Sequence, residues 1–185
     1  MSDTKITKLA LANSLMEMME EMPFEDIKVT SITAHCNLNR NSFYYHFLDK
    51  YDLVCWIFDN DLEKAEKKKA DDYFEAVFNL CEIMMDNKSF YQKALLNKGQ
   101  NCLRDHLKDC LSKMIAGYIK ERMEMNMFSE LYIDFLADSM LKAIEKLLND
   151  DSLDPFQFVN GIKAIIQQGT AIIAGTMTGD NLASS

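Results

Sequence analysis

The sequence predicts an all-α protein, with three N-terminal helices followed by a C-terminal helical bundle and about nine helices in total. Two observations carry this prediction. Apolar residues recur at spacings of three and four along most of the chain, and no alternating strand pattern competes with them. Only two prolines and six glycines occur among the 185 residues, so few positions would break a helix.

The composition, 48% hydrophobic and 26% charged, is typical of a packed globule. No uninterrupted apolar segment reaches the roughly 18 residues that a membrane span needs, and the N-terminus lacks a basic flank followed by an apolar run. The five cysteines are scattered and contain no CxxC pair. We therefore expect a soluble, unexported, cytoplasmic protein with reduced thiols and no contact with membranes.

The first predicted helix covers residues 5–22 and ends at Pro23. Phe24 and Ile27 are expected to be buried in the turn that follows. A short second helix is predicted to begin near Thr30 and to reach about Cys36. The apolar stripe of the first helix is formed by Ile6, Leu9, Ala12, Met16 and Met19.

The connection Asn37-Leu38-Asn39 predicts a tight turn, because asparagine tolerates the left-handed backbone that a sharp turn needs. Leu38 is expected to point inward and Asn39 to cap the next helix. That third helix should run from Arg40 to about Phe47. A fourth is predicted from about Lys50 into the charged stretch 63–71.

Periodic apolar residues predict five further helices, near 72–86, 88–97, 99–124, 128–149 and 155–177. The predicted domains are residues 1–50, containing the first three helices, and residues 51–185. The formal charge of -9 lies mostly in the second part. Residues 1–50 carry five Lys or Arg against seven Asp or Glu, a net of -2, which leaves -7 for residues 51–185.

Two short helices joined by a turn of three or four residues, as predicted for residues 30–50, form a unit that presents its second helix to a DNA major groove. Residues 29–54, VTSITAHCNLNRNSFYYHFLDKYDLV, resemble the TetR/AcrR family of regulators. The family's aromatic run ending in His-Phe, with a lysine a few residues later, corresponds to residues 42–47 and Lys50. Asn37 stands where a glycine is usual, and Asn41 stands where glycine or proline is common.

The resemblance implies a helix-turn-helix that binds double-stranded DNA. Arg40, the only arginine in the first hundred residues, is expected to read guanine, and Asn41 and Ser42 are the next candidates for base contacts. Tyr44 could touch a base or a phosphate. The predicted DNA-binding set is Thr30, Asn39, Arg40, Asn41, Ser42, Tyr44, Tyr45 and Lys50, with Thr30, Tyr45 and Lys50 assigned to phosphates.

Other interpretations of these residues stay open. Phe43 and Phe47 are four residues apart and are expected in the core, and His46 is expected to be a structural hydrogen-bond donor. Tyr44 or Tyr45 could pack against the first helix instead of facing DNA.

The resemblance also implies a C-terminal homodimer that often encloses a small-molecule effector. The last two helices are apolar enough to form a four-helix dimer interface, although an ordinary intramolecular core explains them equally well. Methionines and phenylalanines could line an effector cavity or fill the core. The apolar residues of the two helices are Leu131, Phe135, Met140, Ile144 and Leu147, then Phe158, Ile162, Ile165, Ile166, Ile172 and Ile173.

Cys102, His106 and Cys110 recur every four residues beside Asp105 and Asp109, a spacing that could bind a metal or sense oxidants. One straight helix rarely closes a tetrahedral site, so semi-buried side chains on an amphipathic helix are the favoured interpretation. We predict no metal site and no cofactor.

The sequence thus favours a DNA-binding transcriptional regulator, a ligand-responsive repressor acting as a homodimer. The alternative is a co-regulator whose C-terminal bundle binds a partner protein resembling a dihydroxyacetone kinase subunit, as in one branch of the family. An enzyme is the least favoured class, because the sequence contains no Gly-rich phosphate loop, no HExxH and no nucleophile motif.

Overall fold

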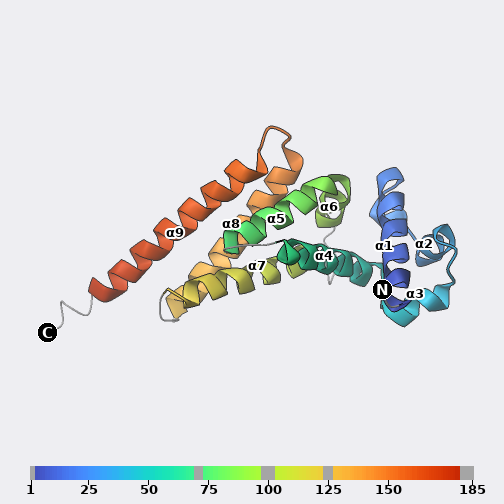
Figure 1. The fold of residues 1–185 in the computed structure, drawn as a ribbon, viewed down its shortest axis with the longest axis horizontal. Helices are drawn as coiled ribbons and strands as arrows, with labels where there is room; N and C mark the ends of the chain where they lie inside the picture. Colours follow the sequence, from blue (N-terminus) through green and yellow to red (C-terminus); the bar gives the residue numbers. More distant parts are fainter. Residues whose placement is uncertain (1–2, 69–72, 97–102, 123–126, 180–185) are drawn as a thin grey trace. The chain divides into compact units, whose positions relative to one another are not determined.

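The computed structural model describes residues 3–68, 73–96, 103–122 and 127–179. Over these residues it contains nine α-helices, one short 3-10 helix and no strand, which confirms the predicted all-α fold (Figure 1). The helices are α1 (Asp3–Glu21), η1 (Phe24–Asp26), α2 (Val29–His35), α3 (Arg40–His46), α4 (Lys50–Lys67), α5 (Tyr73–Asp86), α6 (Lys88–Leu96), α7 (Leu103–Lys120), α8 (Met127–Asn149) and α9 (Pro155–Gly179).

The observed bounds follow the predicted ones closely, because the helix ends carry the caps that the sequence supplies. The carboxylate of Asp49 accepts hydrogen bonds from the backbone of Tyr51 and Asp52 at the start of α4, at 2.8 and 2.9 Å. Asp154 accepts from the backbone N–H of Gln157 at 3.2 Å, just before Pro155 begins α9.

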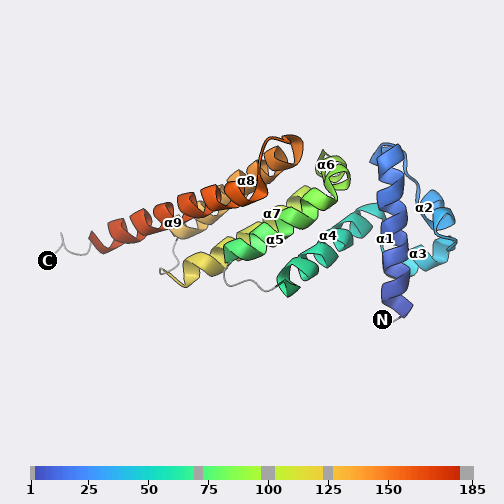
Figure 2. The same ribbon diagram turned by 45° about the horizontal axis from the view of Figure 1, so that its top comes forward.

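The three N-terminal helices pack on one another: α1 contacts α2 and α3, and α2 contacts α3 (Figure 2). Their shared core contains Leu11, Leu15, Ile32 and Phe43, none of which is accessible to solvent. Phe24, the first residue of η1, is also buried, as predicted. This core fixes α3 against the other two helices through its buried face.

Contacts divide the chain into two compact units, of which the first comprises residues 1–65 and 83–106. In this unit α6 packs against α1. The ammonium of Lys93 on α6 donates hydrogen bonds to the carbonyls of Met19 and Glu20, which lie in the last turn of α1. Lys93 thereby satisfies carbonyls that the end of a helix leaves without intrahelical partners.

The second unit comprises residues 66–82 and 107–185, and in it α8 and α9 run side by side in opposite directions (Figure 1). Lys108 on α7 bridges to Asp134 and Asp138 on α8, with both Nζ–Oδ1 distances at 2.9 Å. Because these contacts are exposed, they orient the two helices more than they stabilise them. Apolar packing between the helices supplies the core of this unit.

The division into a DNA-binding domain of residues 1–50 and an effector-binding and dimerisation domain of residues 51–185 stays a prediction. The two compact units do not follow it, because α4 begins at Lys50 and remains with the first unit to residue 65. Within the described ranges, no helix is both long enough and apolar enough to cross a bilayer.

Candidate nucleic-acid interface

The turn between α2 and α3 depends on Asn37, which has a φ of 56°, in the left-handed region. Its N–H donates to the carbonyl of Ala34 at 3.2 Å, and the next N–H, of Leu38, donates to Thr33 at 2.8 Å. Asparagine is among the few non-glycine residues that adopt this conformation at low cost. The predicted left-handed turn is confirmed, and Asn37 is the residue that adopts the left-handed conformation.

Asn39 caps α3, as predicted. Its side-chain oxygen accepts the backbone N–H of Ser42 at 2.9 Å and the Ser42 hydroxyl at 3.2 Å. This cap fixes Arg40 as the first residue of α3. It also engages the oxygen of Asn39 and the hydroxyl of Ser42 within the protein, so DNA contacts by these two residues stay predictions.

The helix α3 has a buried face and an exposed face. Phe43 and Phe47 are buried, with ring centroids 5.7 Å apart, which confirms their predicted place in the core. Arg40, Asn41, Tyr44 and Tyr45 are exposed, as is Thr30 on α2. Tyr45 is 81% exposed, so it does not pack against α1. Asn39, just before α3, is exposed as well, so six of the eight predicted DNA-binding residues share the open surface around α2 and α3.

Arg40 and Tyr44 lie one helical turn apart and contact each other. The guanidinium carbon of Arg40 is 5.2 Å from the centroid of the Tyr44 ring, and its Nη2 donates to the Tyr44 hydroxyl at 3.4 Å. A cation held over an aromatic face loses less freedom on binding than a side chain extended into water. The arginine fork is therefore partly ordered at the exposed start of α3.

The ammonium of Lys50, which the sequence assigned to a DNA phosphate, binds backbone carbonyls of the protein. Its ammonium donates to the carbonyls of Phe24, Glu25 and Ile27 at 2.6, 3.0 and 2.9 Å. Three bonds use all three donors of an ammonium group. Burial lowers the pKa of Lys50, although the carboxylates of Glu25 and Asp26 oppose this shift. These contacts favour a structural role, in which Lys50 ties the start of α4 to η1.

Lys8 is a cation of this region that sequence analysis missed. Its Nζ lies 5.2 Å from the ring centroid of Phe47 and 5.6 Å from that of Trp56. One signal in the sequence could have revealed it. Lys8 precedes the buried residues Leu11 and Leu15 by three and seven positions, which places it on the inward face of α1.

His46 ends α3 beside Lys8. Its ring is half-buried and meets the Tyr45 ring edge-on, with centroids 4.8 Å apart. Partial burial lowers the pKa of His46, and the positive charge of Lys8 lowers it further. The imidazole is therefore mainly neutral near pH 7, and Lys8 carries the charge at this end of α3.

The predicted cluster of Cys102, His106 and Cys110 is described only in part, because Cys102 lies outside the described residues. His106 pairs with Asp59 on α4, with Nε2 2.6 Å from Oδ1. Cys110 is half-buried. In the described part of the chain, no three His, Cys, Asp or Glu side chains are grouped closely enough to hold a metal ion.

The second unit contains an apolar pocket between α5, α7, α8 and α9. The space left in it is about 20 Å³, which holds roughly one water molecule. Ligand sites for small molecules usually measure about 300–1,000 Å³. Its own side chains therefore nearly fill this pocket. They are Tyr73, Phe74, Val77, Leu111, Met114, Ile115, Tyr118, Met140 and Ile166.

The apolar residues of α8 and α9 fall into two sets. Leu131, Phe135, Ile165 and Ile172 are 64–67% exposed. The buried set, which belongs to the intramolecular core, is Met140, Ile144, Leu147 and Ile166. Phe158 and Ile162 are half-buried, and the side chain of Ile173 lies outside the described residues. The intramolecular core therefore accounts for the buried set, and a dimer interface formed by the exposed set stays a prediction.

Comparison with known proteins identifies a family model that matches more than half of the chain. Residues 71–168 match the family model TetR_C_8, described as a transcriptional regulator C-terminal region. The HTH-type dhaKLM operon transcriptional activator DhaS of Lactococcus lactis is 27% identical over 95 residues, or 50% of this chain and 51% of that protein. The aligned region thus spans about half the length of this relative.

Solved structures share the fold. The dihydroxyacetone kinase operon activator DhaS has a TM-score of 0.70 at 16% identity, over 90% of this chain and 97% of that one. Thermus thermophilus FadR, a TetR-family transcriptional repressor in complex with lauroyl-CoA, has a TM-score of 0.57 at 14% identity, over 88% and 94% of the two chains. At these identities the likeness establishes the fold alone.

Proposed function

The chain belongs to the TetR family of transcriptional regulators, and we propose that it is a ligand-responsive repressor that binds its operator as a homodimer. Its relatives are regulators rather than enzymes. In the proposed complex, the two copies of α3 enter successive major grooves about 34–36 Å apart on a near-palindromic site. A regulator of this kind acts where the DNA is, in the cytoplasm.

The observation that carries this proposal is that α3 has one buried apolar face and one exposed polar face. Its buried phenylalanines fix the helix against α1 and α2, while Arg40, Asn41, Tyr44 and Tyr45 face outward. We assign Arg40 to guanine, because a guanidinium fork matches the two acceptors of that base in the major groove. Asn41 is assigned to a neighbouring base edge, and Thr30 and Tyr45 are assigned to backbone phosphates.

The exposed apolar side chains of α8 and α9 support the homodimer. Four large residues, Leu131, Phe135, Ile165 and Ile172, lie open to solvent on two adjacent helices. Gly161 and Gly175 on α9 have open space beside them, which would let a second helix approach closely. A second copy of the same two helices would bury these residues in a four-helix bundle.

For the effector, we propose the apolar pocket beside Met114 and Met140. Because the pocket is nearly full, a ligand must displace these side chains, and methionine is flexible enough to allow it. A displacement shared by α5, α7, α8 and α9 could then alter the spacing of the two recognition helices.

A second candidate is a co-regulator, even an activator, whose bundle binds a partner protein resembling a dihydroxyacetone kinase subunit. The similarity to DhaS and the small size of the pocket both favour it. A pull-down that recovers such a subunit would support this candidate. A thermal shift caused by a small metabolite would support the repressor.

DNA binding is tested by fluorescence anisotropy, with a duplex from the protein's own upstream region and a shuffled duplex as competitor. Arg40→Ala should cost about 1–3 kcal/mol of discrimination between the two. Lys120→Ala, which removes an exposed charge from α7 in the other unit, is the control and should leave discrimination unchanged. If the wild-type protein binds neither duplex at low salt, the proposal is wrong.

A further inference from the structure

Residues 1–50 contain only five cationic side chains that could neutralise DNA phosphates. They are Lys5, Lys8, Lys28, Arg40 and Lys50, and seven carboxylates oppose them. Neutralisation of phosphates supplies much of the affinity for DNA. Each cation that is not already neutralised within the protein should therefore make a measurable difference.

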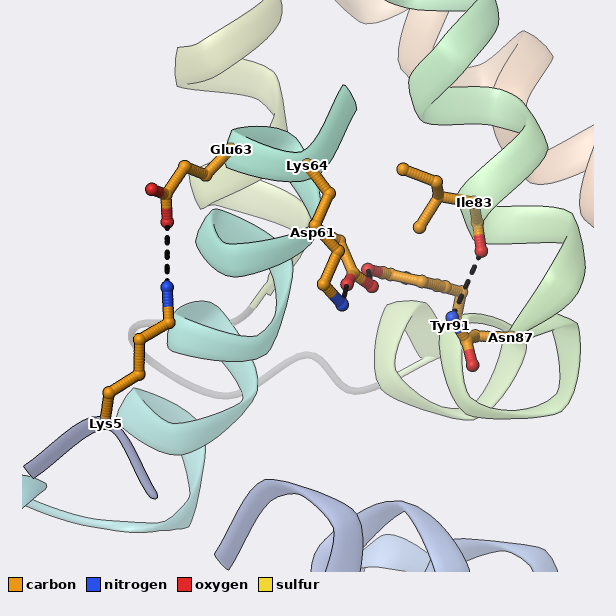
Figure 3. Close-up of polar contacts among 7 residues, drawn as sticks. All are labelled: Lys5, Asp61, Glu63, Lys64, Ile83, Asn87 and Tyr91. Carbon is orange, nitrogen blue, oxygen red and sulfur yellow. Dashed lines mark hydrogen bonds and ion pairs between the residues drawn. The ribbon is translucent and has the colours of Figure 1, made fainter. Parts of the chain in front are cut away.

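Two of the five cations are engaged within the protein. Lys5 pairs with Glu63 on α4, with 3.7 Å between Nζ and Oε2 (Figure 3). Lys50 donates all three of its hydrogens to backbone carbonyls. Lys50 would have to lose these bonds to bind a phosphate, and the charge of Lys5 is already offset by the carboxylate of Glu63.

Lys8 is held without being neutralised. The rings of Phe47 and Trp56 attract its ammonium through their electron-rich faces, but they carry no charge that would cancel it. In the described part of the chain, Lys8 forms no ion pair with a carboxylate. Asp59 and Glu63 line the same surface groove, but they pair with His106 and Lys5.

The aromatic contact also places Lys8 with respect to α3. Phe47 is the C-cap residue that directly follows α3, so the ammonium lies beside the C-terminal end of the recognition helix. When such a helix lies in the major groove, residues that flank it meet the sugar-phosphate strands. Two rings restrict the lysine to this position, which reduces the entropy that it would lose on binding.

We propose that Lys8 binds a DNA backbone phosphate at the C-terminal end of α3, and that it fills the role the sequence assigned to Lys50. This inference rests on the proposed function, since it concerns the same DNA complex. Lys28 is exposed just before α2, and none of the contacts described for it reaches α3, so the inference is restricted to Lys8.

The test is the salt dependence of operator affinity, measured by anisotropy for the wild-type protein, Lys8→Met, Lys8→Arg and Lys5→Met. The slope of log K against log salt is about -0.9 for each neutralised phosphate. Lys8→Met should therefore reduce the slope by about 0.9 per subunit, or about 1.8 for a dimer. The affinity ratio of wild type to variant should then fall about 12-fold between about 50 and about 200 mM salt.

The controls separate charge from folding. Lys8→Arg keeps the charge and should keep the wild-type slope, whereas Lys5→Met removes a lysine that is already paired and should also keep it. Circular dichroism checks that each variant is folded at the assay temperature. If Lys8→Met destabilises the protein, Lys8→Gln replaces it, because glutamine keeps a polar group over the rings.

The outcomes also separate this inference from the proposed function. A wild-type protein that shows no preference for its operator overturns the proposed function. A wild-type protein that binds its operator, combined with a folded Lys8→Met variant of unchanged slope, overturns the Lys8 inference alone. A smaller slope in Lys5→Met but not in Lys8→Met would show that Lys5 binds the phosphate. That result would also overturn the Lys8 inference.

Discussion

The hydroxyl of Tyr91 on α6 donates a 2.7 Å hydrogen bond to the carboxylate of Asp61 on α4 (Figure 3). Tyr91 is fully buried and Asp61 is 2% exposed. Lys64, one turn along α4, pairs with the other carboxylate oxygen at 2.7 Å. Burial and the negative charge of Asp61 raise the pKa of Tyr91 well above its usual value, so the hydroxyl remains a donor. The bond joins two helices of the unit that contains α3.

Tyr91→Phe should lower the free energy of unfolding by about 1.5–3 kcal/mol, because a buried carboxylate loses its only buried donor in the described contacts. Urea unfolding followed by circular dichroism measures this change. Lys64→Met is the matched control and should cost less than about 1 kcal/mol, since that ammonium is 57% exposed. Equal effects of the two substitutions would contradict a dominant role for the buried bond.

Much of the N-terminal fold could be predicted, because local rules determine it. Pro23 ends α1, Asn37 makes the left-handed turn, and Asn39 caps α3. Each of these residues acts on backbone within a few positions of itself. The spacing of Phe43 and Phe47 alone predicts that both lie in the core, and both side chains are buried.

The roles of the lysines could not be predicted, because they depend on contacts between residues distant in the sequence. Lys50 meets carbonyls 23–26 positions earlier, and Lys93 meets Met19 from 74 positions later. The position of Lys50 in the family motif suggested DNA contact, whereas its hydrogen bonds indicate a structural role. For Lys8, the spacing to Leu11 and Leu15 indicates only the inward face of α1. Its contacts with the rings of Phe47 and Trp56, which lie far along the sequence, follow from the fold.

Gly169 on α9 permits a close approach by Tyr132 on α8. A methyl group at position 169 would overlap the hydroxyl of Tyr132 and lie 3.2 Å from its ring carbon Cζ. Gly169→Ala should therefore lower the free energy of unfolding by about 1–3 kcal/mol, despite the higher helix propensity of alanine.

The reciprocal variant tests the cause of this loss. Tyr132→Phe removes the overlapping oxygen, together with a hydrogen bond that it shares with Thr170. The double variant Tyr132→Phe and Gly169→Ala should therefore be more stable than the sum of the two single effects predicts. Strict additivity would show that the alanine acts through some other contact.

The thiol of Cys81 on α5 should not react with alkylating reagents in the folded protein. Its side chain is 1% exposed, and burial raises the pKa of its thiol to about 12. At about pH 8 only about one molecule in ten thousand would carry the reactive thiolate. Alkylation with iodoacetamide, read by peptide mass spectrometry, should leave Cys81 unmodified until the protein unfolds. The same reagent in denaturant is the control, and equal rates in the two states would contradict the burial.

The exposed apolar residues of α8 and α9 give the sharpest test of the proposed dimer. Phe135→Asp and Ile165→Asp would each place a charge in the proposed interface, twice per dimer by symmetry. An unpaired carboxylate in an apolar interface costs several kcal/mol, so each variant should sediment as a monomer. Leu96→Asp, at an equally exposed apolar position of α6, is the matched control and should keep the wild-type mass. A wild-type protein that is monomeric at micromolar concentration would contradict the dimer. Dimeric aspartate variants would place its interface elsewhere.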